Sequence, residues 1–289
     1  MPGPESPGGP PAGQTLIDGL GRKITVPVPA RRIVSLAPSN TEILFAIGAG
    51  AAVAGRDDFS DYPPEAAKVP AVGLATGRLQ KEKIVALDPD LVLAAEINSP
   101  EQVKALETLG LTVLLLGNPT SFEGLDANIR LLGEITGRSA EGAALASSLN
   151  ARIARVRERI AGVARRPTVF YEIDSTDPTK PWTAGAGTFI DTLIRLAGGE
   201  NLGARFGGDF PRVSIETIIR ADPDVIILGD AAFGVTVETA RGRAGWEGLS
   251  AVQNGRIHAF DDDLGSRPGP RLVEGLETLA RLLHPNLAR

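Results

Sequence analysis

One stretch of the sequence occurs twice: EKIVALDPDLVLA spans residues 82–94, and ETIIRADPDVIIL spans residues 216–228. The copies align without a gap, so Glu82 matches Glu216 and the two Asp-Pro-Asp triplets coincide. Proline disfavours helix at the preceding residue, which predicts that a short amphipathic helix ends just before each Asp-Pro. The apolar run after each triplet is continuous, as in a parallel strand buried on both faces. The duplication predicts two similar α/β halves, each with one glutamate at the same point.

The rest of the chain alternates strands with helices. Apolar runs in the first half predict strands at residues 32–36, 52–55, 91–95 and 112–116, with helices that include 41–47 and 99–109. In the second half, strands are expected at 168–173, 225–228 and 256–260, and helices at 187–196, 214–220, 237–245 and 271–283. Such alternation implies parallel sheets with right-handed crossovers.

A long helical stretch separates the halves. Apolar side chains spaced for one helix face run from Leu145 to Ile160, and Pro167 closes the stretch. A helix of about 25 residues would be about 38 Å long. The predicted fold class is therefore α/β: two Rossmann-like lobes with central parallel sheets, joined by a single long helix that acts as a rigid strut. The expected boundaries are a tether at 1–15, a first lobe at 16–137, the linking helix at 138–164 and a second lobe at 165–289.

Composition limits the classes of function. The net charge of −5 and the pI of about 5.3 indicate no basic surface for nucleic acid. The absence of cysteine excludes disulfides, thiolate metal sites and a cysteine nucleophile. With only two histidines, an imidazole-rich transition-metal site is not expected. No stretch reaches the roughly 18 apolar residues of a membrane-spanning helix.

The N-terminus, MPGPESPGGPPAG, is rich in proline and glycine and is predicted to be disordered. It lacks the basic start and apolar centre of a signal peptide. Two interpretations stay open at this point. The segment is either an unstructured start of a cytosolic protein or an expression remnant, or it is a tether left after removal of a secretion or lipoprotein signal.

Four segments together resemble a known family. They are RRIVSLAPSNTEILFAIGAG from Arg31, FSDYPPEAAKVPAVG from Phe59, KIVALDPDLVLA from Lys83 and RPGPRLVEGLETLARLLHP from Arg267. Over about residues 16–285, the chain is similar to the solute-binding proteins of importers for cobalamin, haem and iron–siderophore complexes. The likeness is greatest to the cobalamin-binding members, which carry a similar Ser-Asp-Tyr-Pro-Pro loop. The resemblance implies two α/β lobes bridged by one long helix, with the ligand held in the cleft between the lobes.

The resemblance also implies a function and a location. The protein would be the extracytoplasmic substrate-binding component of an ABC importer, capturing cobalamin or a related metal chelate and delivering it to the permease and its ATPase. It would be a monomer peripheral to the membrane, without catalytic residues, a metal site or a cofactor of its own. It would be periplasmic or a membrane-anchored lipoprotein, with the Pro/Gly-rich start as the tether that remains after signal removal.

The duplicated glutamates gain a role from the same resemblance. In this family, one surface glutamate on each lobe docks onto arginines of the permease, and Glu82 and Glu216 occupy the matching positions. Two charge pairs far apart on one body fix orientation as well as attraction. The alternative is that each glutamate is only an exposed first-turn residue favoured by the helix dipole.

Three aromatic residues are candidates for ligand contacts. Phe59 and Trp182 match aromatic positions of the cobalamin-binding members, and Phe210 lies shortly before the second repeat copy. Loops at the carboxyl ends of parallel strands are where open α/β sheets bind ligands. Ordinary packing is the alternative for all three. It fits Trp182 least well, because the surrounding Asp-Pro-Thr-Lys-Pro offers little local core.

Polar residues on two loops complete the candidate site. The resemblance places Asp263 and Arg267 where the cobalamin-binding members have an acid and an arginine at the same spacing. They could bind the amide side chains of a corrin, or Arg267 could pair with a carboxylate. Arg56 and Tyr62 have a similar status in the first lobe. The alternative for these loops is a solvated turn with a capping aspartate.

The choice among ligands stays open. Where the cobalamin-binding members have a tryptophan before the docking helix, this chain reads Gly-Leu-Ala-Thr-Gly at residues 73–77, and aromatic residues make up only 4%. Haem needs a tyrosine or histidine axial ligand, for which Tyr62 is the candidate, since Tyr171, His258 and His284 fall in predicted strands or helices. A siderophore would favour arginines, available at residues 56, 78, 205, 212 and 267.

An enzymatic function is the alternative from another class. Double-Rossmann folds also host enzymes such as chelatases. However, the chain has no G-x-G-x-x-G after the first strand, no P-loop, no G-x-S-x-G and no H-E-x-x-H. The aspartates at 57–58 and 261–263 could bind a hard cation, although such runs at loop tips are usually solvated. The sequence therefore favours a binding protein, which binds its ligand stoichiometrically without turnover.

Overall fold

The computed structural model describes residues 13–287, which form two compact units. Unit 1 comprises the described residues up to Pro119 together with Glu123–Ser148, and unit 2 comprises Thr120–Phe122 together with the described residues from Leu149 onward. Most of the predicted tether, residues 1–12, lies outside the described residues. The tether prediction was too long by three residues, because 13–15 belong to strand β1 (Gly13–Ile17), which pairs with β2 (Lys23–Pro27).

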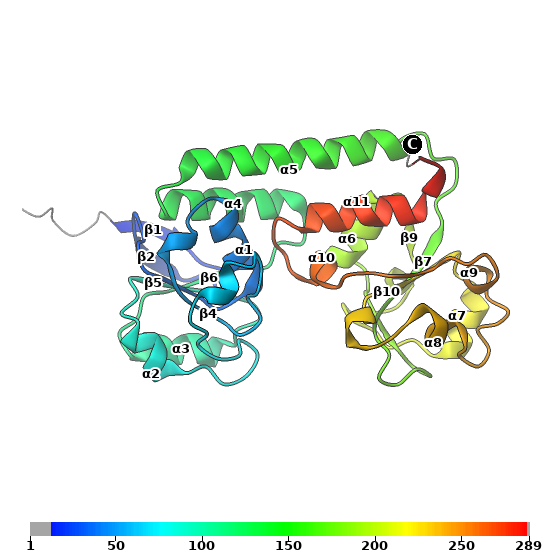
Figure 1. Ribbon diagram of the computed structural model, residues 1–289, viewed down its shortest axis with the longest axis horizontal. Helices are drawn as coiled ribbons and strands as arrows, with labels where there is room; N and C mark the ends of the chain where they lie inside the picture. The colour runs from blue at the N-terminus through cyan, green and yellow to red at the C-terminus, as the bar shows by residue number, and fades with distance from the viewer. Residues whose placement is uncertain (1–12, 288–289) are drawn as a thin grey trace, which may run out of the picture. The chain divides into compact units, whose positions relative to one another are not determined.

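Unit 1, whose strands β4, β5 and β6 are labelled in Figure 1, is built on a four-stranded sheet. The strand order is β4-β3-β5-β6, and every neighbouring pair is parallel. The side chains of β3, β5 and β6 are buried throughout, as continuous apolar runs predict for a sheet covered on both faces. The strands are β3 (Ile33–Ser35), β4 (Val53–Arg56), β5 (Leu91–Ala95) and β6 (Val113–Leu116).

The helices of unit 1 cover this sheet and supply the rest of its core. Val34, Val92 and Val113 of the sheet pack in one cluster with Ile84 of helix α2. Helix α1 begins three residues earlier than expected, because Pro38 suits the first position of a helix. The helices are α1 (Pro38–Ala46), α2 (Lys81–Ala86), α3 (Pro100–Thr108) and α4 (Phe122–Ile135), with 3₁₀ turns at Gly50–Ala52 and Ala66–Lys68.

Unit 2 has its own sheet in the order β11-β10-β7-β8, with β9 also paired to β7. Its β7, β9, β10 and β11 pair in parallel, whereas β8 is antiparallel to β7. The core cluster on one face joins Phe170, Ile226 and Ile257 of the sheet to Ile218 and Trp246. The strands are β7 (Thr168–Asp174), β8 (Trp182–Thr183), β9 (Glu200–Asn201), β10 (Val225–Leu228) and β11 (Ile257–Ala259).

The helices of unit 2 include two short ones, α9 and α10, that the sequence did not predict. The segment after β11, expected as a loop, contains the short helix α10. The helices are α6 (Phe189–Leu196), α7 (Ile215–Ala221), α8 (Val237–Arg241), α9 (Ser250–Gln253), α10 (Asp263–Ser266) and α11 (Leu272–Leu283), with 3₁₀ turns at Leu202–Arg205, Ala231–Phe233 and Pro285–Leu287.

The two repeat copies adopt the same local structure. The first forms α2 and β5, and the second forms α7 and β10. Asp88 and Asp222 turn the chain between helix and strand with φ of 46° and 44°, a left-handed conformation that non-glycine residues seldom adopt. Asp90 then accepts hydrogen bonds from two backbone N–H groups just before β3, and Asp224 accepts one from the first residue of β7. Each copy is therefore hydrogen-bonded to the start of another strand of its own sheet, β3 in unit 1 and β7 in unit 2.

Helix α5 (Ser139–Ile160) is the long helix predicted between the two halves. With 22 residues, it is shorter at its C-terminal end than the expected 138–164. The division between the units falls inside this continuous helix, after Ser148. The structure therefore confirms the predicted fold class of α/β units with central parallel sheets.

Candidate functional site

The loop after β4 carries two of the predicted ligand contacts and rests on a buried hydroxyl network. Thr41 Oγ1 lies 2.8 Å from Ser35 Oγ and 2.9 Å from Ser60 Oγ, and Ser60 Oγ donates to Asp57. All four side chains are buried. Asp57 also accepts from the backbone N–H of Phe59 at 3.2 Å, which fixes the turn at the tip of the loop.

Phe59 and Tyr62 stand out from this loop, with 49% and 41% of their surfaces exposed. Exposed aromatic rings on a loop held by buried hydrogen bonds are suited to contact a ligand, because little ordering is left to occur on binding. Packing in the protein's own core, the alternative for Phe59, does not account for this exposure. Both residues stay predicted ligand contacts.

Arg56 ends β4 at the start of this loop, and its side-chain hydrogen bonds stay within the loop. Its guanidinium donates to the carbonyl oxygens of Ala66, Asp57, Asp58 and Ala67, at 2.8–3.3 Å. Four of its five N–H groups are therefore used within its own loop, and at most one is left for a ligand. Asp58 links this loop to the 73–78 segment, since its backbone N–H donates to Gly73 O and its side-chain carboxylate accepts from the Gly73 N–H. Arg56 therefore mainly holds the loops of unit 1 in place and contributes little to binding a ligand.

In unit 2 the structure brings Trp182 and Phe210 into one paired segment. The backbone of Thr183 donates to Pro211 O at 2.9 Å, and Gly185 donates to Asp209 O at 2.7 Å. A Cβ on Gly185 would lie 2.0 Å from the Gly208 carbonyl oxygen, so this approach requires glycine. Trp182 and Phe210 are 41% and 54% exposed, and they stay candidate contacts.

The indole of Trp182 has a cationic neighbour. The Arg212 guanidinium carbon lies 5.6 Å from the ring centroid, and Arg212 also pairs with Asp177 at 2.7 Å. The cation–π contact holds the indole in place at the carboxyl edge of the sheet. An arginine engaged in this way is less available to an anionic ligand, which bears on the siderophore alternative.

A buried charge network supports the loop after β7. Arg243 binds both carboxylate oxygens of Glu172, donates to Ser175 Oγ at 2.9 Å and lies 4.6 Å from the ring centroid of Trp246. Ser175 also donates through its backbone and hydroxyl to Asp230. Burial raises the pKa of Glu172 above its ordinary value, and the bond from Arg243 opposes that rise.

Asp263 and Arg267 lie on α10 and at its end, where they bind each other. Arg267 Nε donates to Asp263 at 2.7 Å, and Arg271 approaches the same carboxylate at 3.4 Å. About a third of the Asp263 side chain is exposed, against 15% for Arg267. The pair therefore presents one carboxylate edge, in place of the two separate contacts that the spacing suggested.

One exposed aromatic residue was missed by the sequence reasoning. Phe233 follows β10, the central strand of the second sheet, and 82% of its surface is exposed. The rule that ligands bind at the carboxyl ends of strands also covers this loop and could have identified the residue. With Phe233, three loops at the carboxyl edge of the unit 2 sheet each carry an exposed aromatic or acidic group.

The duplicated glutamates are both exposed on the first turns of their helices. Glu82 follows Lys81 on α2, and Glu216 follows Ile215 on α7. A hydrogen bond from Ser214 lowers the pKa of Glu216, so this carboxylate stays charged at neutral pH. Neither acid is buried against its own fold, which is a precondition for docking through charge pairs; docking itself stays a prediction.

The other metal-ligating side chains have structural positions. Tyr171 is fully buried in β7, where burial, and then the charges of Asp262, Asp230 and Asp261, raise the pKa of its hydroxyl well above the ordinary value. His284 Nε2 donates to the carbonyl oxygen of Gly198, 3.2 Å away. Within residues 13–287 no group of three histidine or acidic side chains is placed to hold a metal ion. The same residues contain no helix with the length and apolar character needed to cross a membrane.

Comparisons with known proteins agree with this architecture. The sequence model of a family described as periplasmic binding protein matches residues 33–264. An uncharacterized ABC transporter substrate-binding lipoprotein of Bacillus subtilis is 33% identical over 94% of this chain and 86% of its own length. A cobalamin-binding protein of Halobacterium salinarum is 30% identical over 92% of this chain and 73% of its own.

A solved structure extends the likeness to three dimensions. The periplasmic haem-binding protein RhuT of Roseiflexus sp. RS-1, in its apo form, superposes with a TM-score of 0.79 at 31% identity, covering 89% of this chain and 99% of that one. The family resemblance predicted from the four sequence segments is thus confirmed. The chain belongs to the periplasmic binding protein family.

Proposed function

We propose that this protein is the extracytoplasmic substrate-binding component of an ABC importer and that it binds a metal chelate of the cobalamin type. Family membership supports a binding role, and the named relatives are binding proteins of transporters, not enzymes. The partners would be a permease and its ATPase. Anchoring by a lipid, as in the name of the Bacillus relative, is part of the proposal.

The observation that carries the proposal is the set of exposed aromatic side chains on loops at the carboxyl edges of the strands. Phe59 and Tyr62 supply them in unit 1, and Trp182, Phe210 and Phe233 supply them in unit 2. Large flat or apolar ligands gain most of their affinity by covering such rings. The buried networks beneath the loops hold the rings in place before the ligand arrives.

Haem is the second candidate, because Tyr62 is an exposed tyrosine on one of these loops and could act as an axial ligand. The similar proteins include one named as a cobalamin-binding protein and one named as a haem-binding protein. A siderophore is supported less, since Arg212 and Arg267 already pair with Asp177 and Asp263. A chelatase has no support beyond the general versatility of the fold.

The test is a titration of the purified protein with cyanocobalamin, haemin and a ferric siderophore, followed by calorimetry and tryptophan fluorescence. The two tryptophans differ usefully, because Trp182 is exposed whereas Trp246 is fully buried. We expect saturable binding of one cobalamin per chain with no product formed. A protein that binds none of the three chelates, or that converts one catalytically, would contradict the proposal.

A variant identifies the contact. Trp182→Phe should weaken cobalamin binding about tenfold, because a smaller ring replaces the indole and its contact with Arg212 is weakened. Phe206→Leu is the matched control, since Phe206 is a partly buried aromatic that packs against the unit 2 core. The control should keep the affinity of the wild type, and equal weakening by both variants would argue against a direct contact at Trp182.

A further inference from the structure

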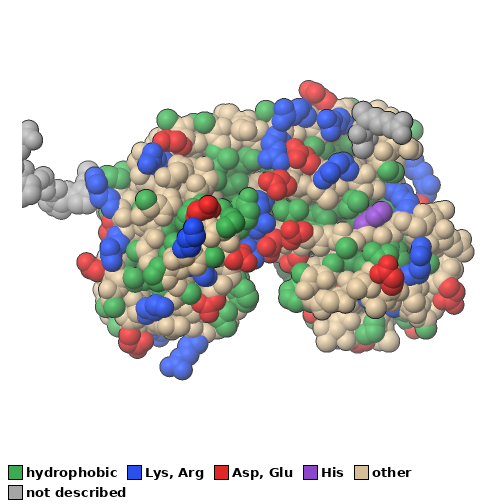
Figure 2. Space-filling view, viewed as in Figure 1, with side chains coloured by type: hydrophobic (Ala, Val, Ile, Leu, Met, Phe, Trp, Pro, Cys, Tyr) green, Lys and Arg blue, Asp and Glu red, His purple; other side chains and the backbone are tan. Residues whose placement is uncertain are grey.

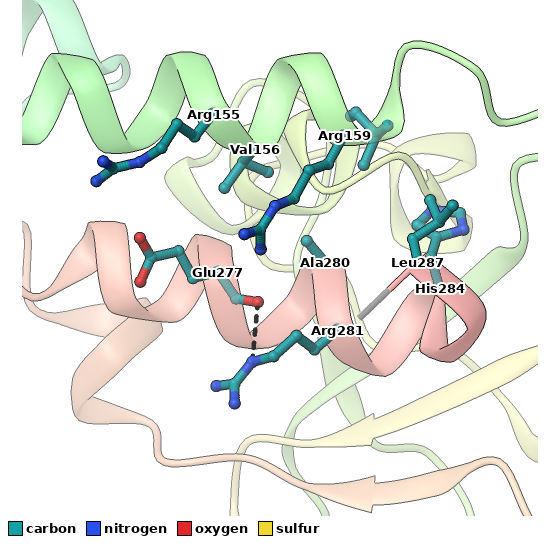
Figure 3. Close-up of a pocket in the computed structure, with 9 residues that line it drawn as sticks. Arg155, Val156, Arg159, Glu277, Ala280, Arg281, His284 and Leu287 are labelled. Atoms are coloured by element: carbon teal, nitrogen blue, oxygen red, sulfur yellow. Dashed lines mark hydrogen bonds between the residues drawn. The ribbon is translucent and has the colours of Figure 1, made fainter. Parts of the chain in front are cut away.

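A cavity of about 450 Å³ lies inside unit 2 between the C-terminal half of α5 and helix α11. It is formed by one unit alone and involves none of the residues discussed so far as ligand or docking contacts. Figure 3 shows Arg155 and Arg159 extending from α5 toward α11. The cavity is lined by Arg155, Val156, Arg159, Ile160, Glu277, Ala280, Arg281, His284 and Leu287.

The charges around this cavity are unbalanced. Its one lining carboxylate, Glu277, is held at both oxygens by Arg152, at 3.0 and 2.8 Å. Among the described residues, none forms an ion pair with Arg155, Arg159 or Arg281. Between residues 151 and 166 the chain has six arginines and one glutamate, although its net charge is −5. Basic side chains accordingly gather over α5 and α11 of this unit in Figure 2.

Helix stability alone does not explain these arginines. The dipole of a helix favours cations only within its last turn. The dipole can therefore account for Arg159 in the last turn of α5 and for Arg281 in the last turn of α11. Arg155 lies more than one turn before the end of α5, and its position four residues from Arg159 places two like charges on one face, which disfavours the helix.

The cavity also has apolar walls and a neutral imidazole. Val156, Ile160, Ala280 and Leu287 line it between the charged groups. Burial lowers the pKa of His284, and the charges of Arg256 and Arg166 lower it further, so the ring is uncharged at neutral pH. A ligand that suits these walls combines a compact anion with an apolar substituent.

We propose that this cavity is a binding site for a phosphate group. Guanidinium groups bind phosphate through paired N–H donors, and arginines from two helices can address several oxygens of a tetrahedral anion at once. A carboxylate has only two oxygens, so it would engage the paired N–H donors of only one guanidinium. The phosphate could belong to free inorganic phosphate or to a lipid phosphomonoester, whose acyl groups would cover the apolar walls.

His284 gives a direct readout of occupancy. The chain has only two histidines, so ¹³C labelling at their rings gives two signals, with His258 of β11 as internal reference. Three probes are titrated separately: inorganic phosphate, dihexanoylphosphatidate and dihexanoylglycerol. We expect saturable shifts of the His284 signal and a rise in its pKa with the two phosphate-bearing probes, and no change with the uncharged diacylglycerol.

The relative affinities identify the source of the phosphate. Equal affinity for inorganic phosphate and dihexanoylphosphatidate assigns the site to the free anion. Binding of the phosphatidate that is tenfold tighter or more assigns it to a lipid phosphate seated against the apolar walls. If neither probe shifts His284 up to millimolar concentration, or if diacylglycerol shifts it equally, the proposal is wrong.

Matched variants separate the site from the general positive charge. R155Q/R159Q should weaken phosphatidate binding by about tenfold or more, since two charge-assisted contacts are lost. R157Q removes one charge from an exposed position on the same helix that does not line the cavity. It should bind as the wild type does, and R159Q alone should not. Equal loss in R157Q and R159Q would show non-specific attraction and overturn the proposal.

Discussion

The two units share a backbone plan but support their candidate ligand-binding loops with different chemistry. In unit 1 the support beneath the loop is made of hydroxyl groups, with Thr41 between Ser35 and Ser60. In unit 2 the equivalent edge of the sheet rests on the buried ion pair of Glu172 with Arg243. A buried ion pair depends on both partners far more than a hydroxyl network does, because a lone buried charge is costly. Duplication has therefore preserved strand order and turn geometry while the polar interior diverged.

The helices of the two repeat copies, α2 and α7, also differ. Glu82 lies between Lys81 and Lys83, whereas Glu216 lies between Ile215 and Thr217 and has its carboxylate stabilised by Ser214. The flanking lysines of the first copy reduce the local negative potential. If both glutamates meet arginines of a permease, the second copy should contribute more to docking.

The largest effect is expected from charge reversal at both copies. E82K/E216K should abolish uptake of the ligand in cells that depend on this importer, because two attractions become repulsions. The single variants should each lower uptake, by about tenfold for E216K and by less for E82K. Uptake of labelled cobalamin measures transport, and calorimetry on the purified variants should show unchanged ligand affinity.

Two other glutamates provide the control for this experiment. Glu101 on α3 and Glu238 on α8 are also exposed first-turn residues, one in each unit, but lie outside the repeat. E101K/E238K makes the same change in net charge and should leave uptake intact. If it reduces uptake as much as E82K/E216K does, the effect comes from overall charge, and the docking role of the repeat is refuted.

The next largest effect should distinguish the two buried networks. R243M should destabilise the protein by about 3–5 kcal/mol at pH 7, since Glu172 loses its partner while remaining buried. In unit 1, Thr41→Val should cost about 1–3 kcal/mol, because only neutral hydroxyl groups lose a partner. Denaturant unfolding measures both. Comparable losses for the two variants would show that the networks do not differ as proposed.

The R243M loss should also vary with pH in a defined direction. Burial already raises the pKa of Glu172, and removal of Arg243 takes away the contact that opposes the rise. A carboxyl whose pKa is higher in the folded state than in the unfolded state contributes no penalty below its unfolded pKa, where both states are protonated. The destabilisation should therefore be smaller at pH 4 than at pH 7. A larger loss at pH 4 would contradict the raised pKa.

The turn aspartates of the repeat test a smaller difference. Asp88 and Asp222 have nearly the same left-handed backbone, but only Asp222 binds the backbone and hydroxyl of Ser250, each at 2.7 Å. Glycine relieves strain at both positions. D88G should be neutral or slightly stabilising, whereas D222G should cost about 1–2 kcal/mol through the lost hydrogen bonds. Thermal unfolding compares the two variants. Equal effects would show that the relief of backbone strain outweighs the lost hydrogen bonds to Ser250.

Much of the fold was predictable because the repeated segment specifies the same local structure in both units. The Asp-Pro-Asp triplets and the apolar runs after them predict helix, turn and buried strand in both units, and Ile84 and Ile218 are buried as the pattern requires. The predicted helix at 41–47 begins three residues too late, because proline, which often marks a loop, also suits the first turn of a helix. Helix α10 was missed because four residues are too few to show periodicity.

The site was less predictable because it depends on side-chain contacts, some local and some distant in sequence, that residue spacing does not specify. Spacing identified Arg56 and Arg267 as candidates but could not show that the first binds its own loop and the second binds Asp263. Glu172 and Arg243 are far apart in the sequence, and no local sequence pattern predicts that they pair. Phe233, by contrast, was within reach of the sequence, because it follows the predicted strand at 225–228 and ligands bind at the carboxyl ends of such strands.

The smallest predicted effect concerns the residue just before each repeat helix, α2 and α7. Ser214 caps α7 through its hydroxyl, which accepts from the Thr217 backbone, whereas Gln80 before α2 makes no side-chain cap. S214A should cost about 1 kcal/mol and Q80A close to none. Because Ser214 also lowers the pKa of Glu216, the S214A variant should show a higher Glu216 pKa by carboxyl NMR. At neutral pH Glu216 would still be charged, so uptake should persist in S214A. A loss of uptake without a loss of charge would mean that docking depends on the position of the helix as well as on its glutamate.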